Sequence, residues 1–424
     1  MIENILEALA KNNINKYIVS SMEEETLELY LIKKKVDMSR KKHVNLYSVN
    51  VLRDFDEEGV EYTGNSEVSV YDTMSDDELN DAIKDAYFSA GFVKNKRYAV
   101  PEGVKREKVI KKSSLSEKSM EEIILKIKDA LYKYDNFEKG LINSAEIFLS
   151  RIDKRIVSSS GTDVSYRLYK TQGEFITQWV DKNDVETYNS FSYEDLNEEE
   201  LSLLVKEGIT NTGYRDEAEE APDTGKYNVI LTDNNVIEFF KYYFVKADTS
   251  MIYQKYSDFK LGDKVQGEDI KGDKLNITLK ASTPFSDEGI ELKERELLKD
   301  GELKNIAGSF KFAQYLGLEP IGEYDGGYVR GGNIPVKDLF LDGELEILRF
   351  SDFQMDALTG DFAGEIRLAL LKKGDKVIKL TGGSLAANIK DVQNNITLSM
   401  EMQNFGAFTV PKAIKLRNVE ISGK

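Results

Sequence analysis

The segment "YNVILTDNNVIEFFKYYF", Tyr227 to Phe244, joins a short apolar strand to a helix that is apolar on nearly every side. The strand-like run "YNVILT" ends just before Asp233 and Asn234, and either residue can cap the first amides of a helix. Within the helix only Glu238 and Lys241 are charged. A helix without a polar face is buried in the core of a domain. The sequence therefore predicts a strand followed by a buried helix.

Length and charge limit the class of protein. A chain of 424 residues is longer than one hydrophobic core usually serves, so two domains are expected. The acidic stretch "RDEAEEAPDTGK", with Pro222 and Gly225, separates them, and we predict domains at residues 1–222 and 225–424. Lys and Arg total 58 against 75 Asp and Glu, a net charge of −17 that would repel a phosphate backbone. Direct binding of nucleic acid is therefore not expected.

The supply of metal-binding and nucleophilic side chains is small. No cysteine is present, which excludes disulfides, zinc knuckles, iron–sulfur clusters and thiol nucleophiles. The single histidine, His43, stands between "SRKK" and a strand and is expected on the surface. The opening "MIENILEALAKNNINKY" carries acidic residues, unlike a secretory signal, and no apolar run is long enough to span a bilayer. We expect a cytoplasmic protein without a membrane segment.

Helices are predicted at three places in the N-terminal half. Ser75 begins a capping box with Glu78, which marks the start of one helix. A second is predicted from Ser116 to about Tyr134, and a third, over about residues 193–214, closes this half.

Strands fill much of the remaining sequence. Residues 144–181 read as a meander with turns at Ser160-Gly161 and Gln172-Gly173. The C-terminal half repeats one kind of hairpin turn, at Lys299-Asp300-Gly301, Leu341-Asp342-Gly343 and Lys372-Lys373-Gly374. The predicted class is α+β. Its N-terminal domain mixes helices with antiparallel strands, and its C-terminal domain is dominated by antiparallel hairpins around the buried helix.

One loop carries adjacent carboxylates. Asp287, Glu288 and Gly289 precede the hairpin that closes at Asp300-Gly301. Two carboxylates can contribute to a site for a hard cation, but without a third ligand at regular spacing they more often form a solvated turn. We favour the turn.

Several longer motifs resemble one known family. The run "ASTPFSDEGIELKERELLKDGELKNIAGSFKFAQYLGLEPIG" is similar to the central signature of the TldD/PmbA family, the modulators of DNA gyrase classed as peptidase family U62. "SSSGTDVS" resembles its strand and turn before the linker helix, and "TGDFAGEIRLALLKKGDKV" resembles its "SGDFS" hairpin. "LTGGSLAANIKDVQNNI" resembles its "IAGNL" helix, and "NFGAFTVPKAIKLRNVEISG" resembles the usual ending.

The resemblance implies a zinc-dependent peptidase complex that acts on unfolded or small peptides. TldD-type subunits carry an H-E-x-x-x-H zinc motif on a helix after a strand, whereas PmbA subunits, also called TldE, lack it and pair with TldD around a cleft. Here the helix at Asn234–Phe244 occupies the place of that motif. Glu238 and Tyr243 stand where the histidines would fall, and Phe239 stands where the general-base glutamate would. Because no histidine follows His43, no zinc ligand pair can form.

These observations favour a PmbA-type, non-catalytic subunit without a cofactor of its own, with zinc only in a catalytic partner. It would wall the peptide cleft and offer a sheet edge to an extended substrate. We expect a dimer, with a TldD-like homologue or with itself. The matching motifs suggest candidate cleft positions at Ser160, Gly161, Asp287, Glu288, Gly289, Gly360, Asp361 and Phe362.

Two other hypotheses remain open. The first is a homodimeric hydrolase that holds Mg²⁺ or Mn²⁺ with carboxylates such as Asp287, Glu288 or Asp361, which requires oxygen ligands that converge in space. The second is a stand-alone interaction protein that keeps the peptidase-derived fold.

Overall fold

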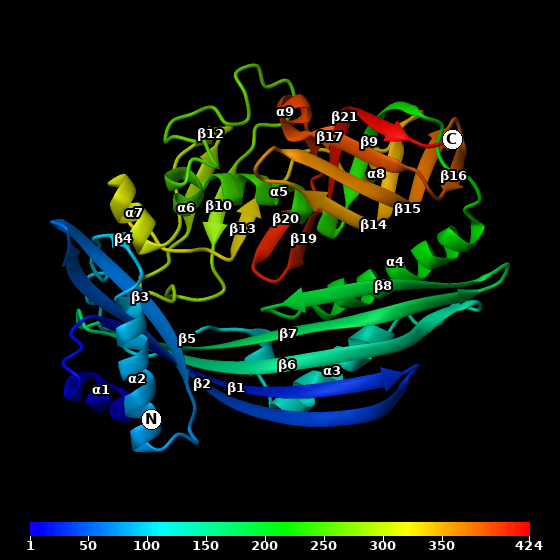
Figure 1. Ribbon diagram of the computed structural model, residues 1–424. Helices are drawn as coiled ribbons and strands as arrows, with labels where there is room; N and C mark the ends of the chain where they lie inside the picture. The colour runs from blue at the N-terminus through cyan, green and yellow to red at the C-terminus, as the bar shows by residue number, and fades with distance from the viewer.

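One eight-stranded sheet organises the N-terminal half in the computed structural model, which describes residues 1–424 (Figure 1). Its order is β4-β3-β2-β1-β6-β7, and β5 and β8 both lie next to β7. All neighbours are antiparallel except β5 and β7. Because β8 pairs with β7 alone, one edge of β8 is free. The strands are β1 (Tyr17–Ile32), β2 (Lys35–Glu57), β3 (Val60–Val70), β4 (Asn95–Lys96), β5 (Val109–Ile110), β6 (Gly140–Ser158), β7 (Asp163–Val180) and β8 (Asp184–Tyr193).

The helices of this half are α1 (Ile2–Lys11), α2 (Asp76–Ala90), α3 (Met120–Tyr132) and α4 (Glu198–Glu217), with a 3₁₀ turn at Ser114–Ser116. The predicted capping box is confirmed, since Ser75 Oγ accepts from the Glu78 amide and Glu78 Oε2 accepts from the Ser75 amide. The last helix begins later than predicted. Tyr193 still belongs to β8, and the Asn197 side chain caps the amides of Glu199 and Glu200.

The two predicted turns of the meander have different outcomes. The turn at Ser160-Gly161 is confirmed, because it joins β6 to β7 and Gly161 has φ +98°. The turn at Gln172-Gly173 is wrong, since both residues lie inside β7. Gly173 serves packing instead: a Cβ there would lie 2.6 Å from Cζ of Phe191 on β8. The glycine leaves room for a neighbouring aromatic ring and does not reverse the chain.

The C-terminal half contains two further sheets with α5 (Asn234–Lys246) beside them (Figure 1). The seven-stranded sheet has the order β14-β9-β21-β17-β15-β16 with β18 beside β21, and the six-stranded sheet has the order β12-β11-β10-β13-β20-β19. The first contains β9 (Gly225–Thr232), β14 (Leu345–Met355), β15 (Asp361–Lys373), β16 (Lys376–Leu380), β17 (Ser384–Asn388), β18 (Thr397–Leu398) and β21 (Ala413–Ser422). The second contains β10 (Ile277–Lys280), β11 (Arg295–Lys299), β12 (Glu302–Leu303), β13 (Gly326–Val329), β19 (Met402–Phe405) and β20 (Phe408–Pro411).

Short helices connect these strands: α6 (Thr249–Tyr253), α7 (Phe310–Leu316), α8 (Val336–Leu339), α9 (Ile389–Val392) and a 3₁₀ turn at Gln393–Asn395. Of the three predicted hairpins, those at Asp300-Gly301 and Lys373-Gly374 are confirmed. The one at Asp342-Gly343 is wrong, because these residues lead from α8 into β14. The segment expected to form the "IAGNL" helix begins with β17 and becomes helical only from Ile389, in α9 and the 3₁₀ turn that follows it.

The α+β class is confirmed by mixed helices and mostly antiparallel sheets. One apolar cluster of 36 buried residues lies entirely between Val229 and Ile421. Smaller clusters of 19 and 12 residues fill the N-terminal half. Phe285 from the C-terminal half packs into a fourth cluster with residues of β6 and β7. None of the helices is long and apolar enough to cross a membrane.

Candidate functional site

The buried helix is α5, and its middle is an aromatic core. Phe239 and Tyr243 are fully buried. The ring of Phe239 makes edge-on contacts with those of Phe240 and Phe362, with centroids 5.5 Å apart in both pairs. The Tyr243 hydroxyl donates to Oε1 of Gln393 at 2.8 Å, and burial raises the pKa of this phenol. The prediction of a buried helix is confirmed.

The positions aligned with the zinc motif do not fit a zinc ion. Glu238 points away from the core and pairs with Lys241 at 2.6 Å, whereas Phe239 and Tyr243 point into it. Glu238, Phe239 and Tyr243 therefore do not provide converging N, O or S donors, because they face different surroundings and two of them are aromatic. In the whole chain no group of three or more His, Asp or Glu side chains is placed to hold a metal ion.

Two sets of predicted cleft residues come together. Gly289 has φ +82°, and a Cβ on it would lie 2.7 Å from Thr162 Cγ2, directly after the turn at Ser160 and Gly161. Ser160 Oγ donates to the carbonyl of Pro101 at 2.6 Å. The β6–β7 turn and the loop at residues 287–289 therefore meet where the two halves of the chain touch.

The two carboxylates of that loop are engaged by different partners. Asp287 pairs with Lys154 on β6 at 2.5 Å. Glu288 Oε2 accepts from the Phe310 amide at 2.8 Å, and burial raises the pKa of Glu288 to about 7. Since the two side chains serve separate contacts, they bind this loop to its surroundings.

The third set lies elsewhere. Gly360 has φ +84°, and a Cβ on it would lie 2.9 Å from Ile389 Cγ2. Asp361 accepts from the Asn388 side chain at 2.8 Å, and Phe362 is buried against Phe239. These residues therefore shape the start of β15 and the core around α5. Asp361 does not form a group of possible metal ligands with Asp287 and Glu288.

A groove of about 570 Å³ opens between the two halves, at the N-terminal end of α5. We call it the β8–β19 groove, because the edge strands of two different sheets form its sides. It is lined by residues 188–191 and 193 of β8, residues 197, 199, 200, 203, 204 and 207 at and in α4, residues 233–235, 349 and 350, residues 401–405 at β19, and residue 412. Four of these residues also line an adjoining cavity of about 570 Å³: Tyr193, Asn197, Glu200 and Asn404.

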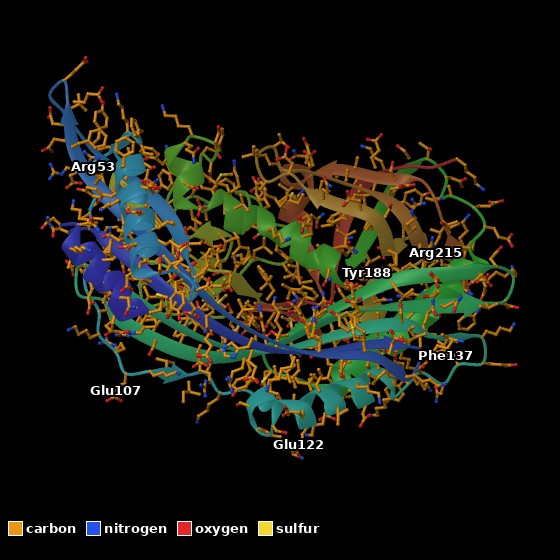
Figure 2. The ribbon with its side chains drawn as sticks, turned by 60° about the horizontal axis from the view of Figure 1, so that its bottom comes forward. Arg53, Glu107, Glu122, Phe137, Tyr188 and Arg215 are labelled. Carbon is orange, nitrogen blue, oxygen red and sulfur yellow. The ribbon has the colours of Figure 1, made fainter.

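The free edge of β8 presents backbone groups to this groove. Near one end the Glu186 carbonyl accepts from Arg215 Nη1 at 2.8 Å. At the other end the Ser192 carbonyl accepts from the Gly406 amide at 2.8 Å. Alternate residues of an antiparallel strand face away from its partner, so the N–H and C=O groups of Tyr188 and Ser190 face the groove. Figure 2 labels Tyr188 and Arg215, which lie where the β8 side of the sheet meets the C-terminal half.

Charged side chains surround the first turn of α5. Asp233 holds the N-cap position with φ +56° but makes no capping hydrogen bond, so the predicted cap is wrong. Its carboxylate instead pairs with Arg349, whose Nη2 also donates to Asn189 Oδ1 on β8 at 2.9 Å. This arginine ties the C-terminal half to the edge strand.

Glu346 on β14 lies near this ion pair. Burial, reinforced by the charges of Asp233 and Glu207, raises the pKa of Glu346 to about 7, although Lys412 acts in the opposite direction. A carboxyl group of this kind exchanges its proton near neutral pH.

Sequence reasoning missed the groove, because β8 fell between the predicted meander and the predicted helix. A signal was available in "DVETYNSFSY", where Phe191 and Tyr193 follow the two-residue period of a half-buried strand. The free edge itself has no signature in a single sequence, since it depends on which strand lacks a neighbour.

Comparisons with known proteins identify relatives by sequence and by fold. Residues 224–423 match a sequence family described as the PmbA/TldA metallopeptidase C-terminal domain. No curated protein sequence matches the chain. The crystal structure of TldE from Thermococcus kodakarensis superposes with a TM-score of 0.78 at 16% identity, covering 100% of both chains.

Two candidate modulators of DNA gyrase have the same fold. The protein from Thermotoga maritima superposes with a TM-score of 0.77 at 18% identity, covering 100% of both chains. The protein from Bacteroides thetaiotaomicron superposes with a TM-score of 0.77 at 16% identity, covering 100% of this chain and 99% of the other. At such identities the likeness establishes the fold along the whole chain.

Proposed function

Because the chain belongs to the TldD/PmbA family through its metallopeptidase-related domain at residues 224–423, we propose that it is a PmbA/TldE-like, non-catalytic subunit of a zinc-dependent peptidase complex. The complex would act on unfolded or small peptides. The observation that carries the proposal is the aromatic core at Phe239 and Tyr243, where a catalytic subunit would need metal ligands. Zinc would then be held by the partner.

The subunit contributes a wall of the substrate cleft. An extended peptide can add a strand to an exposed sheet edge, with affinity supplied by main-chain hydrogen bonds. The groove-facing backbone groups of Tyr188 and Ser190 provide such an edge. This edge supports the β8–β19 groove as the peptide site more strongly than it supports the turn at Ser160 and Gly161 or the start of β15.

The same proposal includes a partner subunit and a division of the chain into two domains. The catalytic partner would be a TldD-like homologue with an H-E-x-x-x-H motif, or the chain would pair with itself when isolated. Residues 1–222 and 225–424 would form its two domains, in agreement with apolar clusters that lie largely on one side or the other of this boundary. We place the complex in the cytoplasm, with neither nucleic acid nor membrane among its ligands.

The test is to isolate the tagged chain from its native cells, identify the proteins that come with it, and measure zinc and peptidase activity with and without them. We expect an H-E-x-x-x-H homologue to be recovered, and activity only when it and zinc are present. Stoichiometric zinc and peptide hydrolysis by the purified chain alone would refute the non-catalytic role. Recovery of other partners, with no peptidase among them, would support a stand-alone interaction protein instead.

A further inference from the structure

We propose that the β8–β19 groove selects an extended peptide segment that carries a bulky apolar side chain, and that this side chain rests on Leu203 and Leu204 of α4. The inference depends on the proposed peptide-binding function and adds its specificity. It is carried by three features: the free edge of β8, an uncovered turn of α4 beneath it, and contacts that close that turn at both ends.

The free edge fixes the kind of occupant. Its open portion lies between two backbone contacts already made within the chain, Arg215 to the Glu186 carbonyl and the Gly406 amide to the Ser192 carbonyl. The six steps along the strand from Glu186 to Ser192, at about 3.3 Å each, give this edge a length of about 20 Å. The contact at Gly406 shows that backbone from outside the sheet already bonds to this edge. Another extended backbone satisfies the groups that remain, at Tyr188 and Ser190.

The floor beneath this edge is one side of α4. The helix packs against β6, β7 and β8 through Leu201, Val205 and Ile209, which are fully buried. The adjacent stripe, at positions 200, 203, 204 and 207, follows the i, i+3, i+4, i+7 spacing of a single helical face and lines the groove. Leu203 is 43% exposed, a large value for a leucine in a concave site. The stripe therefore lies where one more strand would cover it.

Contacts from the C-terminal half close both ends of the stripe. Glu200 accepts from the backbone amide of Asn404 at 3.1 Å, and Glu207 pairs with Lys412. Between these contacts Leu203 is exposed and Leu204 is half-buried against the neighbouring apolar cluster. The result is an apolar pocket that lies between two polar contacts.

Strand geometry directs a peptide side chain into this pocket. Side chains of neighbouring strands that lie opposite one another project from the same face of a sheet. Asn189 and Phe191 project from the buried face of β8, the face on which α4 packs. A peptide residue opposite either of them points toward α4, where an apolar side chain gains from burial and a polar one loses its water.

The experiment measures binding of two fluorescein-labelled peptides, STTLTTS and STTSTTS, to the purified chain by fluorescence anisotropy. They differ only in the central residue, and both can pair with a strand edge. The wild type is expected to bind the leucine peptide at least about tenfold more tightly, as burial of one leucine side chain implies. Leu203→Ser should reduce this preference to less than about threefold. Leu125→Ser on α3, where Leu125 is 51% exposed, is the matched control and should leave the preference unchanged.

A second pair of variants separates specificity from peptide binding itself. Ser190→Pro removes the backbone donor and should weaken binding of both peptides at least about tenfold, whereas Ser190→Ala keeps the donor and should not. Equal affinity of the wild type for the two peptides, with binding lost in Ser190→Pro, would overturn the proposed specificity and leave the peptide groove intact. No binding of either peptide to the wild type would overturn the groove as well.

Discussion

The middle and the first turn of α5 meet opposite surroundings. In the middle, Phe239 and Tyr243 are enclosed by other aromatic rings in the largest apolar cluster of the molecule. At the first turn, Asp233 and Arg349 form an ion pair beside the β8–β19 groove. The middle of the helix is thus enclosed in the core, while its first turn lines the groove. Two neighbouring parts of one helix therefore differ in kind, one serving the core and the other lying at a groove.

Replacing Phe239 tests whether the middle of α5 is core, and it should have the largest effect. Phe239→Ala should lower the free energy of unfolding by about 3–5 kcal/mol, because it deletes a fully buried ring and leaves a cavity. Chemical denaturation followed by circular dichroism measures the change. Phe88→Ala on α2 is the control, since Phe88 is 63% exposed, and it should cost less than about 1 kcal/mol. A similar loss in both variants would show that the middle of α5 is not core.

A change of pH tests the burial of Glu346 near the charged first turn of α5. The pKa of Glu346 is raised from its ordinary 4.5 to about 7, so between these values the folded state keeps a proton that the unfolded state releases. Stability should then fall as pH rises through this window, by about 3 kcal/mol, and change little above it.

Glu346→Gln should remove this contribution. Variant and wild type should be equally stable near pH 4, and the variant should be more stable by about 3 kcal/mol at pH 8. Denaturation at both pH values measures the difference. Because Glu288 also titrates near pH 7, the comparison with wild type is needed to isolate Glu346. A difference that does not vary with pH would contradict the burial of this carboxyl group.

The ion pair at the first turn should have a smaller effect. Arg349→Met removes the partner of Asp233 and the donor to Asn189, and it should cost about 2 kcal/mol in the free energy of unfolding. Adding Asp233→Gly should recover about 1 kcal/mol, because glycine adopts φ +56° without strain and leaves no unpaired carboxylate. If the second change destabilises the first variant further, Asp233 has a stabilising role that this ion pair does not explain.

The smallest effect is expected on the outer side of the helix. Glu238→Ala removes an exposed pair with Lys241, three residues away, and should change the free energy of unfolding by less than about 0.5 kcal/mol. The same denaturation assay tests this. A loss above about 1 kcal/mol would mean that the position aligned with a zinc ligand still has a structural role.

Local patterns predicted much of the fold. The buried helix was evident because α5 has no polar face, and the first boundary of α2 was evident because Ser75 and Glu78 form a capping box. Predictions from glycine were weaker. Gly161 does turn the chain, but Gly173 makes room for Phe191 from a strand that sequence reasoning had not identified. The role of a glycine depends on its neighbours in space.

The site was less predictable than the fold. The motif resemblance predicted cleft residues at Ser160 and Gly289, and these two segments do meet in the structure. It also predicted Phe362 as a cleft residue, but Phe362 belongs to the core around α5. The groove was missed because Leu203, Ser190 and Met402 come from three segments that carry no shared motif. Asp233 followed a familiar capping pattern, but Arg349, 116 residues away, competes for its carboxylate. Such competition is invisible until the chain is folded.

The pairing of β9 with β21 has a consequence for synthesis on the ribosome. These strands lie side by side in the seven-stranded sheet although they come from residues 225–232 and 413–422. The N-terminal sheet has all its strands once Tyr193 has left the exit tunnel, so this part can begin to fold early. The seven-stranded sheet lacks β21, the inner neighbour of β9, until the 190 residues that follow β9 (232 to 422) have been made. During that interval β9 and α5 leave the ribosome as apolar segments without partners, and this is the period when the newborn chain most needs protection from aggregation.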